Sequence, residues 1–293
     1  MTHEPVMVAE VLALLQPARG GTFVDCTAGL GGHARAVLDA GATRLIGLDR
    51  DPDAVARARE ALAPFGARAE LVHADYRELG GVLDARNVPK VDGVLVDLGV
   101  SSMQLDAPGR GFSFSRDEAL DMRMDTSSGA TAAEMLAAVD EPTLADVIYE
   151  FGEERYARRI ARAFVAARAL APVDTTARLA DVVRRAVPRR GYMRIDPATR
   201  TFQAIRIWVN RELDGLDTFL RETVKRLAEG GRIAVISFHS LEDRIVKHTF
   251  RALQSESAPL LRVLTKRPLV PTEAEVDRNP RARSAKLRAA EAV

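Results

Sequence analysis

Four aspartates recur through the first hundred residues, each at or near the end of a short apolar run: Asp25, Asp49, Asp75 and Asp97. Apolar runs that alternate with helix-like segments are typical of a parallel sheet with crossover helices. Ligands of such sheets bind beyond the carboxyl ends of the strands, so we expect the four carboxylates to face one ligand. Either that ligand is rich in hydroxyl and amino groups, or water satisfies the carboxylates.

A glycine-rich loop, DCTAGLGGH at 25–33, follows the first of these runs. Gly29, Gly31 and Gly32 let the backbone approach a ligand closely and adopt positive φ angles. The loop also fits the G-x-G-x-x-A fingerprint of dinucleotide binding. Asp49 is placed where a carboxylate can accept hydrogen bonds from both hydroxyls of a ribose. These features are shared by nicotinamide-dependent enzymes and methyltransferases, so they do not separate the two classes.

Two aspartates favour S-adenosylmethionine over NAD as the cofactor. Asp25 can pair with an amino-acid ammonium, whereas it would repel a pyrophosphate. Asp75 suits the exocyclic amine of adenine, and Tyr76 can stack on the adenine ring. S-adenosylmethionine carries both amines and no phosphate. The alternative interpretation is that Asp25 and Asp75 are helix caps.

The segment that follows the fourth predicted strand, DLGVSSMQ at 97–104, should face the transferred methyl group. An amino nitrogen conjugated to a base ring is a poor nucleophile, because its lone pair is delocalised. An enzyme can accept its N–H hydrogens and hold it in line with the methyl sulfonium, and Asp97 with a hydroxyl of Ser101 or Ser102 could do so. Methylation at C5 of a pyrimidine normally needs a cysteine nucleophile. Cys26 lies in the cofactor loop, so we favour an amino group as the acceptor.

A second polar cluster, SFHSLEDR at 237–244, follows the fifth predicted strand. Phe238 could stack on a flipped base, and His239 could receive a proton or bind RNA. The alternative is structural: Ser240 would cap the next helix and Asp243 would pair with Arg244.

The elements that must position these residues form two domains. We expect a doubly wound α/β domain of 1–106 and 200–293, interrupted by an all-helical domain at 107–199. The pattern predicts strands at Thr22–Asp25, Arg44–Leu48, Glu70–His73, Gly93–Asp97, Arg232–Ser237, Leu261–Lys266 and Ala285–Ala289. It predicts a turn at Gly230–Gly231 and helices at His33–Ala40, Pro52–Ala63, Glu153–Leu170, Thr176–Val187, Phe202–Ala228 and Leu241–Leu253, among others.

The helical domain carries a local excess of arginine. Residues 153–200 hold 12 arginines and 5 acidic residues, a balance of 12 − 5 = +7. Arginine forks bind phosphate bidentately, so this region is a candidate RNA surface. The alternative is a solvated helix face with surface salt bridges. The arginines that we expect to contact RNA are Arg158, Arg162, Arg189 and Arg200.

Composition excludes several classes of protein. The chain has a net charge of +1 and 47% hydrophobic residues, as expected for a globular protein. Its single cysteine excludes an internal disulfide, and no Cys/His cluster has the spacing of a metal site. With neither a secretory signal nor a long apolar run, we expect a cytoplasmic protein without a metal.

These motifs together closely resemble the RsmH (MraW) family, bacterial methyltransferases of cytosine N4 in 16S rRNA. The resemblance runs through the whole chain, and SFHSLEDR at 237–244, RGFSF at 110–114 and DMRMD at 121–125 are more specific than the glycine loop. It implies a seven-stranded class I (Rossmann-like) methyltransferase fold and a cytidine in the decoding centre (P-site region) as substrate. The partner would be 16S rRNA, free or within the 30S subunit. The cofactor contacts that it implies are Gly31, Gly32, His33, Asp49, Tyr76, Asp97 and Gln104.

Three rival functions stay open at this point. The same chemistry could methylate an amine of DNA or of a free base. A nicotinamide-dependent dehydrogenase is disfavoured by Asp25, by Asp75 and by the lack of a clear catalytic pair for hydride transfer. A non-enzymatic ribosome assembly factor with a vestigial cofactor site is disfavoured by the intact glycine loop with Asp49 and Asp97. Thr27 replaces the first glycine of the common methyltransferase loop.

Overall fold

The computed structural model describes residues 4–101, 104–105, 107–188 and 196–293. The chain divides into a sheet unit, Met1–Gly99 with Leu213–Val293, and a helical unit, Val100–Glu212. The helical unit is therefore wider than the predicted insertion of 107–199. Helix α10 (Ala198–Asn210) belongs to it, since Phe202 and Ile205 are buried in its core.

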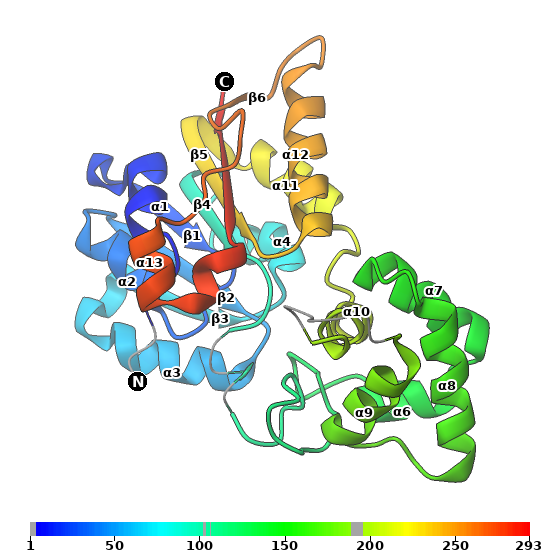
Figure 1. Ribbon diagram of the computed structural model, residues 1–293. Helices are drawn as coiled ribbons and strands as arrows, with labels where there is room; N and C mark the ends of the chain where they lie inside the picture. The colour runs from blue at the N-terminus through cyan, green and yellow to red at the C-terminus, as the bar shows by residue number, and fades with distance from the viewer. Residues whose placement is uncertain (1–3, 102–103, 106, 189–195) are drawn as a thin grey trace. The chain divides into compact units, whose positions relative to one another are not determined.

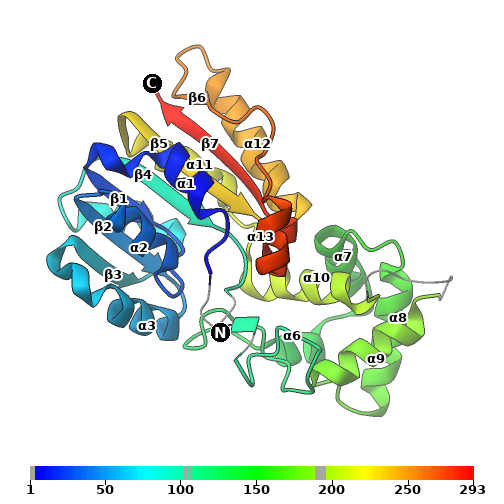
Figure 2. The ribbon, with the colours of Figure 1, turned by 60° about the vertical axis from the view of Figure 1, so that its left-hand side comes forward.

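The sheet unit contains a seven-stranded sheet in the order β3-β2-β1-β4-β5-β7-β6 (Figure 2). Strand β7 is antiparallel to both of its neighbours, and the other pairs are parallel. All seven predicted strands are present, but β5 begins at Leu227 and not at Arg232, and β6 ends at Val263 and not at Lys266. Their bounds are β1 Thr22–Asp25, β2 Arg44–Asp49, β3 Ala69–His73, β4 Val91–Asp97, β5 Leu227–Ser237, β6 Leu261–Val263 and β7 Lys286–Ala292.

Helices cover both faces of this sheet (Figure 1). Successive residues of a strand point to opposite faces, so Phe23 of β1 is buried in one hydrophobic core and Val24 in the other. The sheet unit is therefore doubly wound. On the Phe23 side lie α1 (Val8–Leu15), α2 (Gly32–Asp39) and α3 (Pro52–Leu62), and on the Val24 side lie α4 (Leu79–Asp84), α11 (Leu216–Lys225) and α12 (Ser240–Gln254).

Besides α10, the helical unit contains α6 (Ala132–Ala138), α7 (Glu141–Gly152), α8 (Ala157–Leu170) and α9 (Thr176–Ala186). A capping box of Thr131 and Glu134 begins α6. Helix α8 begins at Ala157, four residues later than the predicted Glu153. The reason is local: Glu153 has a φ of 47°, and the Glu154 side chain accepts the N–H of Tyr156.

Two predictions about the return to the sheet unit are wrong. The predicted helix Phe202–Ala228 is two helices, α10 and α11, because Arg211 and Gly215 adopt positive φ angles of 51° and 66° between them. Gly230–Gly231 is not a turn but part of β5. There Gly230, with a φ of 73°, accommodates a shift in register against β4.

A short helix near the chain end, α13 (Glu273–Arg278), was not predicted. Across the described parts of the chain, no helix is long and apolar enough to cross a membrane.

Candidate active site

The glycine loop joins the ends of three strands in the sheet unit. Asp25 ends β1, Asp49 ends β2 and Asp97 ends β4. The Gly29 N–H donates to Asp49 Oδ2 at 2.7 Å, and the Asp97 N–H donates to the Thr27 hydroxyl oxygen at 2.7 Å. The loop therefore connects three of the four predicted carboxylates at the carboxyl ends of the strands.

Glycine is required at two positions of this loop for different reasons. Gly31 has a φ of 80° directly before α2, a conformation that few side chains tolerate. A Cβ on Gly32 would lie 2.9 Å from the ring of Pro5. The N-terminal segment is thus packed on the loop.

Asp25 is buried and only partly satisfied. Its Oδ1 accepts the Thr27 N–H at 3.1 Å, and its Oδ2 has no hydrogen-bond partner among the described residues. Burial, with a further contribution from the charge of Asp49, raises the pKa of Asp25 to about 7. Because Thr27 is not in a helix, the alternative that Asp25 is a helix cap is wrong. A cationic donor such as an ammonium group fits this carboxylate.

Asp49 accepts a second backbone bond, from the Asp51 N–H to Oδ1 at 2.9 Å. Burial raises its pKa to about 6, although both hydrogen bonds to its carboxylate oppose that rise. Each oxygen retains a lone pair, so the group can still accept bonds from a ribose diol.

Asp97 has an unusual environment for a carboxylate. Its side chain is 24% exposed, and Oδ2 lies 3.6 Å from Nε2 of the buried His33. Its Oδ1 has no hydrogen-bond partner within the described residues. Burial, and then the charges of Asp25 and Glu242, raise the pKa of Asp97 well above its usual range. An N–H donor or a cation at the end of β4 would bind the unpartnered oxygen of Asp97 and favour its ionised form.

Asp75 serves as a cap, as the structural alternative holds. It forms a capping box with Glu78 at the 3₁₀ turn Tyr76–Glu78, and the Arg77 guanidinium contacts both of its oxygens at 2.7 and 2.9 Å. Burial favours a higher pKa, but the bonds from Arg77 outweigh it, and the pKa of Asp75 lies below its usual value. The Tyr76 ring packs against Phe219 at 4.6 Å between centroids and is 8% exposed. Little of that ring is accessible for stacking on adenine.

Within the helical unit, Ser101 and Gln104 bind each other. The Ser101 N–H donates to Gln104 Oε1 at 3.0 Å, and the Gln104 N–H donates to the Ser101 hydroxyl oxygen at 3.2 Å. This is the capping-box pattern S-x-x-Q, a sequence signal that our predictions missed. The other candidate hydroxyl, on Ser102, lies outside the described residues.

The polar cluster after β5 differs from the structural alternative, in which Ser240 caps the helix and Asp243 pairs with Arg244. His239, not Ser240, is the N-cap of α12: its Nδ1 accepts the Glu242 N–H at 3.4 Å, and its Nε2 lies 3.1 Å from the Glu242 carboxylate. Asp243 pairs with Arg288 at 2.6 Å and not with Arg244.

The residue before this cap, Phe238, is half-buried. Its N–H donates to Glu242 Oε2 at 2.9 Å, and its ring lies beside Gly99, which follows β4. Phe238 therefore lies next to the end of β4, where the base was expected.

The single cysteine is a poor nucleophile here. Cys26 is 2% exposed in the core of the sheet unit. Burial, together with the nearby charges of Asp25 and Asp75, raises the pKa of the thiol well above its usual range. A thiol with a raised pKa forms little of the reactive thiolate.

The arginines predicted to bind RNA differ in whether they have an acidic partner. Arg162 lies 3.6 Å from Glu141, and Arg200 lies 3.9 Å from Glu154 and donates to the Glu153 carbonyl. Arg158 is exposed and has no ion pair or hydrogen bond among the described residues. The remaining predicted arginine, Arg189, lies outside the described residues.

Two hydrogen-bonding side chains that hold the site in place, those of Thr27 and Glu275, were not predicted from the sequence. The Thr27 hydroxyl ties the loop to β4, and a threonine in that position was the available signal. Glu275 of α13 accepts the Met7 N–H at 2.6 Å, which holds the segment whose Pro5 covers Gly32. No sequence signal joins residues so far apart in the chain.

The strand order, the antiparallel β7 and the glycine loop among strand-end carboxylates define a class I, Rossmann-like methyltransferase. The half-satisfied Asp25 and the lone pairs of Asp49 fit S-adenosylmethionine, the cofactor of this class and the one the sequence predicts. More narrowly, the chain belongs to the MraW methylase family, whose model matches residues 1–293.

Similar proteins cover nearly the whole chain. Ribosomal RNA small subunit methyltransferase H of Geotalea uraniireducens is 49% identical, over 99% of this chain and 98% of its own length. The protein of the same name in Geobacter sulfurreducens is 51% identical, over 99% and 98%. Among solved structures, an rRNA methylase from Streptococcus thermophilus is similar with a TM-score of 0.41 and 11% identity, covering 94% of this chain and 92% of its own.

Proposed function

We propose that this chain transfers the methyl group of S-adenosylmethionine to the N4 amino group of a cytidine in the decoding centre of 16S rRNA. The observation that carries the proposal is the Asp97 carboxylate, which ends β4 with one buried oxygen unpartnered among the described residues. An amino group conjugated to a base ring offers N–H donors to such an acceptor. The name shared by the relatives supports rRNA of the small subunit as the substrate.

The residues of the sheet unit divide the binding of the cofactor. Asp25 would pair with the ammonium group, and Asp49 would accept the ribose hydroxyls. Gly29, Gly31 and Gly32 would let the backbone approach the amino-acid part. S-adenosylmethionine supplies an electrophilic methyl group on a sulfonium, so the protein must chiefly position the acceptor.

Asp97 would act on the acceptor amine. Its carboxylate accepts an N–H hydrogen, which draws electron density toward the nitrogen and orients the lone pair. The nitrogen must lose one proton once it carries the methyl group, and a carboxylate with a raised pKa can receive that proton. A hydroxyl of Ser101 or Ser102 would accept the second N–H hydrogen.

Two further residues would complete the site. Phe238, beside the end of β4, would stack on the flipped cytosine. His239 would act as a positioning residue rather than as a base, because both of its ring nitrogens face Glu242. Asp75 and Tyr76 would border the adenine with only part of their surfaces.

The test is methyl transfer from labelled S-adenosylmethionine to 30S subunits and 16S rRNA that lack the modification. Nuclease digestion and mass spectrometry should detect N4-methylcytidine at a decoding-centre position. The Asp97→Asn variant should lose about 100-fold or more in turnover, since it cannot receive the proton. Asp217→Asn, at an exposed position of α11, is the matched control and should keep full activity.

Three results would contradict the proposal. Methyl transfer to C5 or to a ribose would overturn the chemistry. Transfer only to DNA or to free bases would overturn the substrate. An Asp97→Asn variant as active as Asp217→Asn would remove the proposed role of Asp97.

A further inference from the structure

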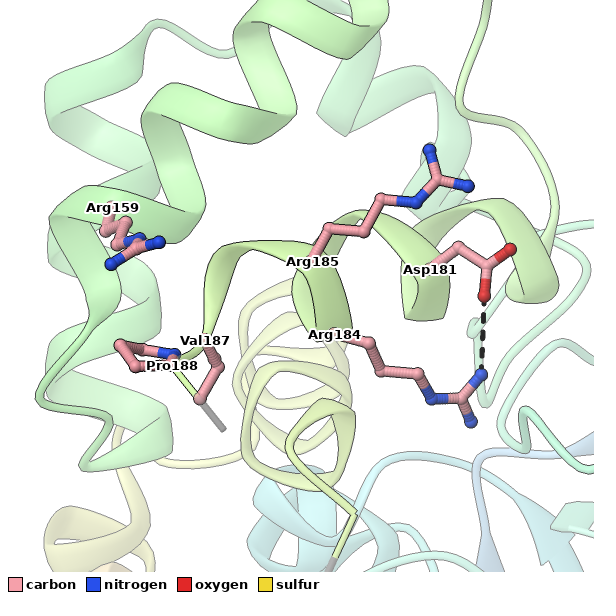
Figure 3. Close-up of a pocket in the computed structure, with 6 residues that line it drawn as sticks. All are labelled: Arg159, Asp181, Arg184, Arg185, Val187 and Pro188. Carbon is pink, nitrogen blue, oxygen red and sulfur yellow. Dashed lines mark hydrogen bonds and ion pairs between the residues drawn. The ribbon is translucent and has the colours of Figure 1, made fainter. Parts of the chain in front are cut away.

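The helical unit contains a pocket between α8 and α9, with a cavity volume of about 430 Å³. Figure 3 shows Arg159 on α8 and three charged side chains on α9. The lining residues are Arg159, Asp181, Arg184, Arg185, Val187 and Pro188. The lining thus includes three arginines and one aspartate.

One of the three arginines is structural. Arg184 lies 2.9 Å from Asp196 and 3.5 Å from Asp181, and its guanidinium also lies 5.6 Å from the ring centre of Phe114. These contacts fix the side chain and compensate its charge. Arg184 therefore forms part of the pocket wall and is not available to a ligand.

The other two arginines are exposed and uncompensated. Neither Arg159 nor Arg185 makes an ion pair or a hydrogen bond to any residue that the structure describes. On the same two helices, by contrast, Arg162 pairs with Glu141 and Arg178 pairs with Asp174. The alternative of a solvated face with salt bridges therefore applies to Arg162 and Arg178 but not to the pocket.

Two arginines without a partner among the described residues line this pocket, and in Figure 3 their guanidinium groups lie apart, with the Arg185 side chain directed away from Arg159. Guanidinium is planar, weakly hydrated and suited to bidentate contact with the oxygens of a phosphate. In an RNA complex, such contacts position the backbone without reading its sequence.

We propose that this pocket binds the phosphate backbone of the RNA substrate, with Arg159 and Arg185 contacting different backbone phosphates and Arg184 as the scaffold. The proposal rests on the proposed function, because it takes RNA as the substrate. It moves the phosphate-binding role from the paired Arg162 and Arg200 to two arginines that have no competing carboxylate.

The test compares Arg159→Gln, Arg185→Gln and the double variant with Arg162→Gln as the matched control. Arg162→Gln removes the same charge from the same helix as Arg159→Gln, but from an arginine that is already paired. Binding of a labelled 16S rRNA fragment would be followed by fluorescence anisotropy at several salt concentrations. Calorimetric titration of each variant with S-adenosylmethionine would verify that the sheet unit is intact.

Each pocket variant should bind RNA about 3- to 10-fold more weakly, and the control less than about 2-fold. The slope of log affinity against log salt should fall by about 1 for each phosphate that the variant no longer neutralises. In methyl-transfer assays, KM for RNA should rise while kcat stays constant. A double variant that binds RNA like Arg162→Gln, with an unchanged slope, would overturn the proposal.

Two further arms separate the possible failures. If wild-type protein methylates no rRNA, the proposed function fails whatever the pocket variants do; if it does methylate rRNA and the double variant keeps wild-type affinity, only the pocket proposal fails. Inorganic phosphate would be titrated against chloride at equal ionic strength. Phosphate binding that needs Arg159 and Arg185, without an effect of these variants on RNA, would assign the pocket to a small anion and overturn the RNA ligand.

Discussion

The two units of this protein keep uncompensated charge in opposite ways. In the sheet unit, Asp25 and Asp97 each have a buried carboxylate oxygen without a hydrogen-bond partner among the described residues. In the helical unit, Arg159 and Arg185 are exposed cations without an acidic partner in the part of the chain that the structure describes. The sheet unit thus has unpartnered carboxyl oxygens in its interior, and the helical unit has unpartnered cations at its surface, among the residues that the structure describes.

This difference determines how each unit should respond to solution conditions. A carboxylate buried without a partner is costly to ionise, so it binds a proton more tightly than in water. An exposed guanidinium stays charged and is screened by salt. Binding at the sheet unit should therefore depend on pH, and binding at the helical unit should depend on ionic strength.

Among the substitutions that test this comparison, we expect the largest effect, a loss of cofactor affinity, from Asp49→Ala. Asp49→Ala removes the acceptor of the Gly29 N–H and, in the proposed function, of both ribose hydroxyls. Affinity for S-adenosylmethionine should fall about 100-fold, the loss expected for two charged hydrogen bonds. Calorimetric titration with S-adenosylmethionine, S-adenosylhomocysteine and NAD measures this loss, and Asp217→Asn is the control. Binding of NAD alone by the wild type would contradict the assigned cofactor.

A smaller effect, on stability, should appear at Asp25 as the pH changes. Burial raises its pKa from 3.8 to about 7, so the folded state binds the proton more tightly than the unfolded state. Its stabilising contribution is complete below pH 3.8 and is lost as the pH rises through about 7. Asparagine does not ionise, so the Asp25→Asn variant should not lose this stability as the pH rises. Relative to wild type, the variant should gain about 1–3 kcal/mol in free energy of unfolding between pH 5 and pH 8.

Urea unfolding of the cofactor-free protein at pH 5, 6, 7 and 8 measures this gain. Asp49, with a pKa of about 6, titrates in the same window, and because its charge contributes to the raised pKa of Asp25, the difference between the two proteins includes the coupling of this pair. The groups with lowered pKa values, such as Asp75 and Asp243, act at lower pH. Parallel stability curves for wild type and Asp25→Asn would show that Asp25 is ionised in the folded state.

The contrast between the units also explains what could be predicted from sequence. The strands and their terminal aspartates were predictable because apolar runs and the strand-end rule are local signals. The partners of those aspartates were not. The bond from the Asp97 N–H to the Thr27 hydroxyl, and that from Met7 to Glu275, join segments that only the folded chain brings together.

The arginine excess of the helical unit was as easy to see in the sequence as the strand-end aspartates. It said less about which residues could bind a ligand. The arginine excess is a property of composition, whereas the ligand capacity of each arginine depends on its neighbours in space. Arg162 and Arg200 are paired with acids of α7 or the segment after it, Glu141 and Glu154. The break between α10 and α11 was missed for a related reason, since apolar periodicity continues across Arg211.

The smallest effects should separate paired from unpaired arginines, and they sharpen the comparison most finely. Arg158 is exposed and has no partner among the described residues, whereas Arg200 donates to the Glu153 carbonyl and lies near Glu154. Arg158→Gln should weaken RNA binding about 2- to 3-fold and lower the salt slope, since an unpaired cation contributes through counterion release. Arg200→Gln should change RNA affinity less than about 1.5-fold, because its charge is already compensated. Anisotropy titrations at low and moderate salt measure both, and equal losses would mean that net charge alone, and not the pairing of each arginine, governs RNA binding by this unit.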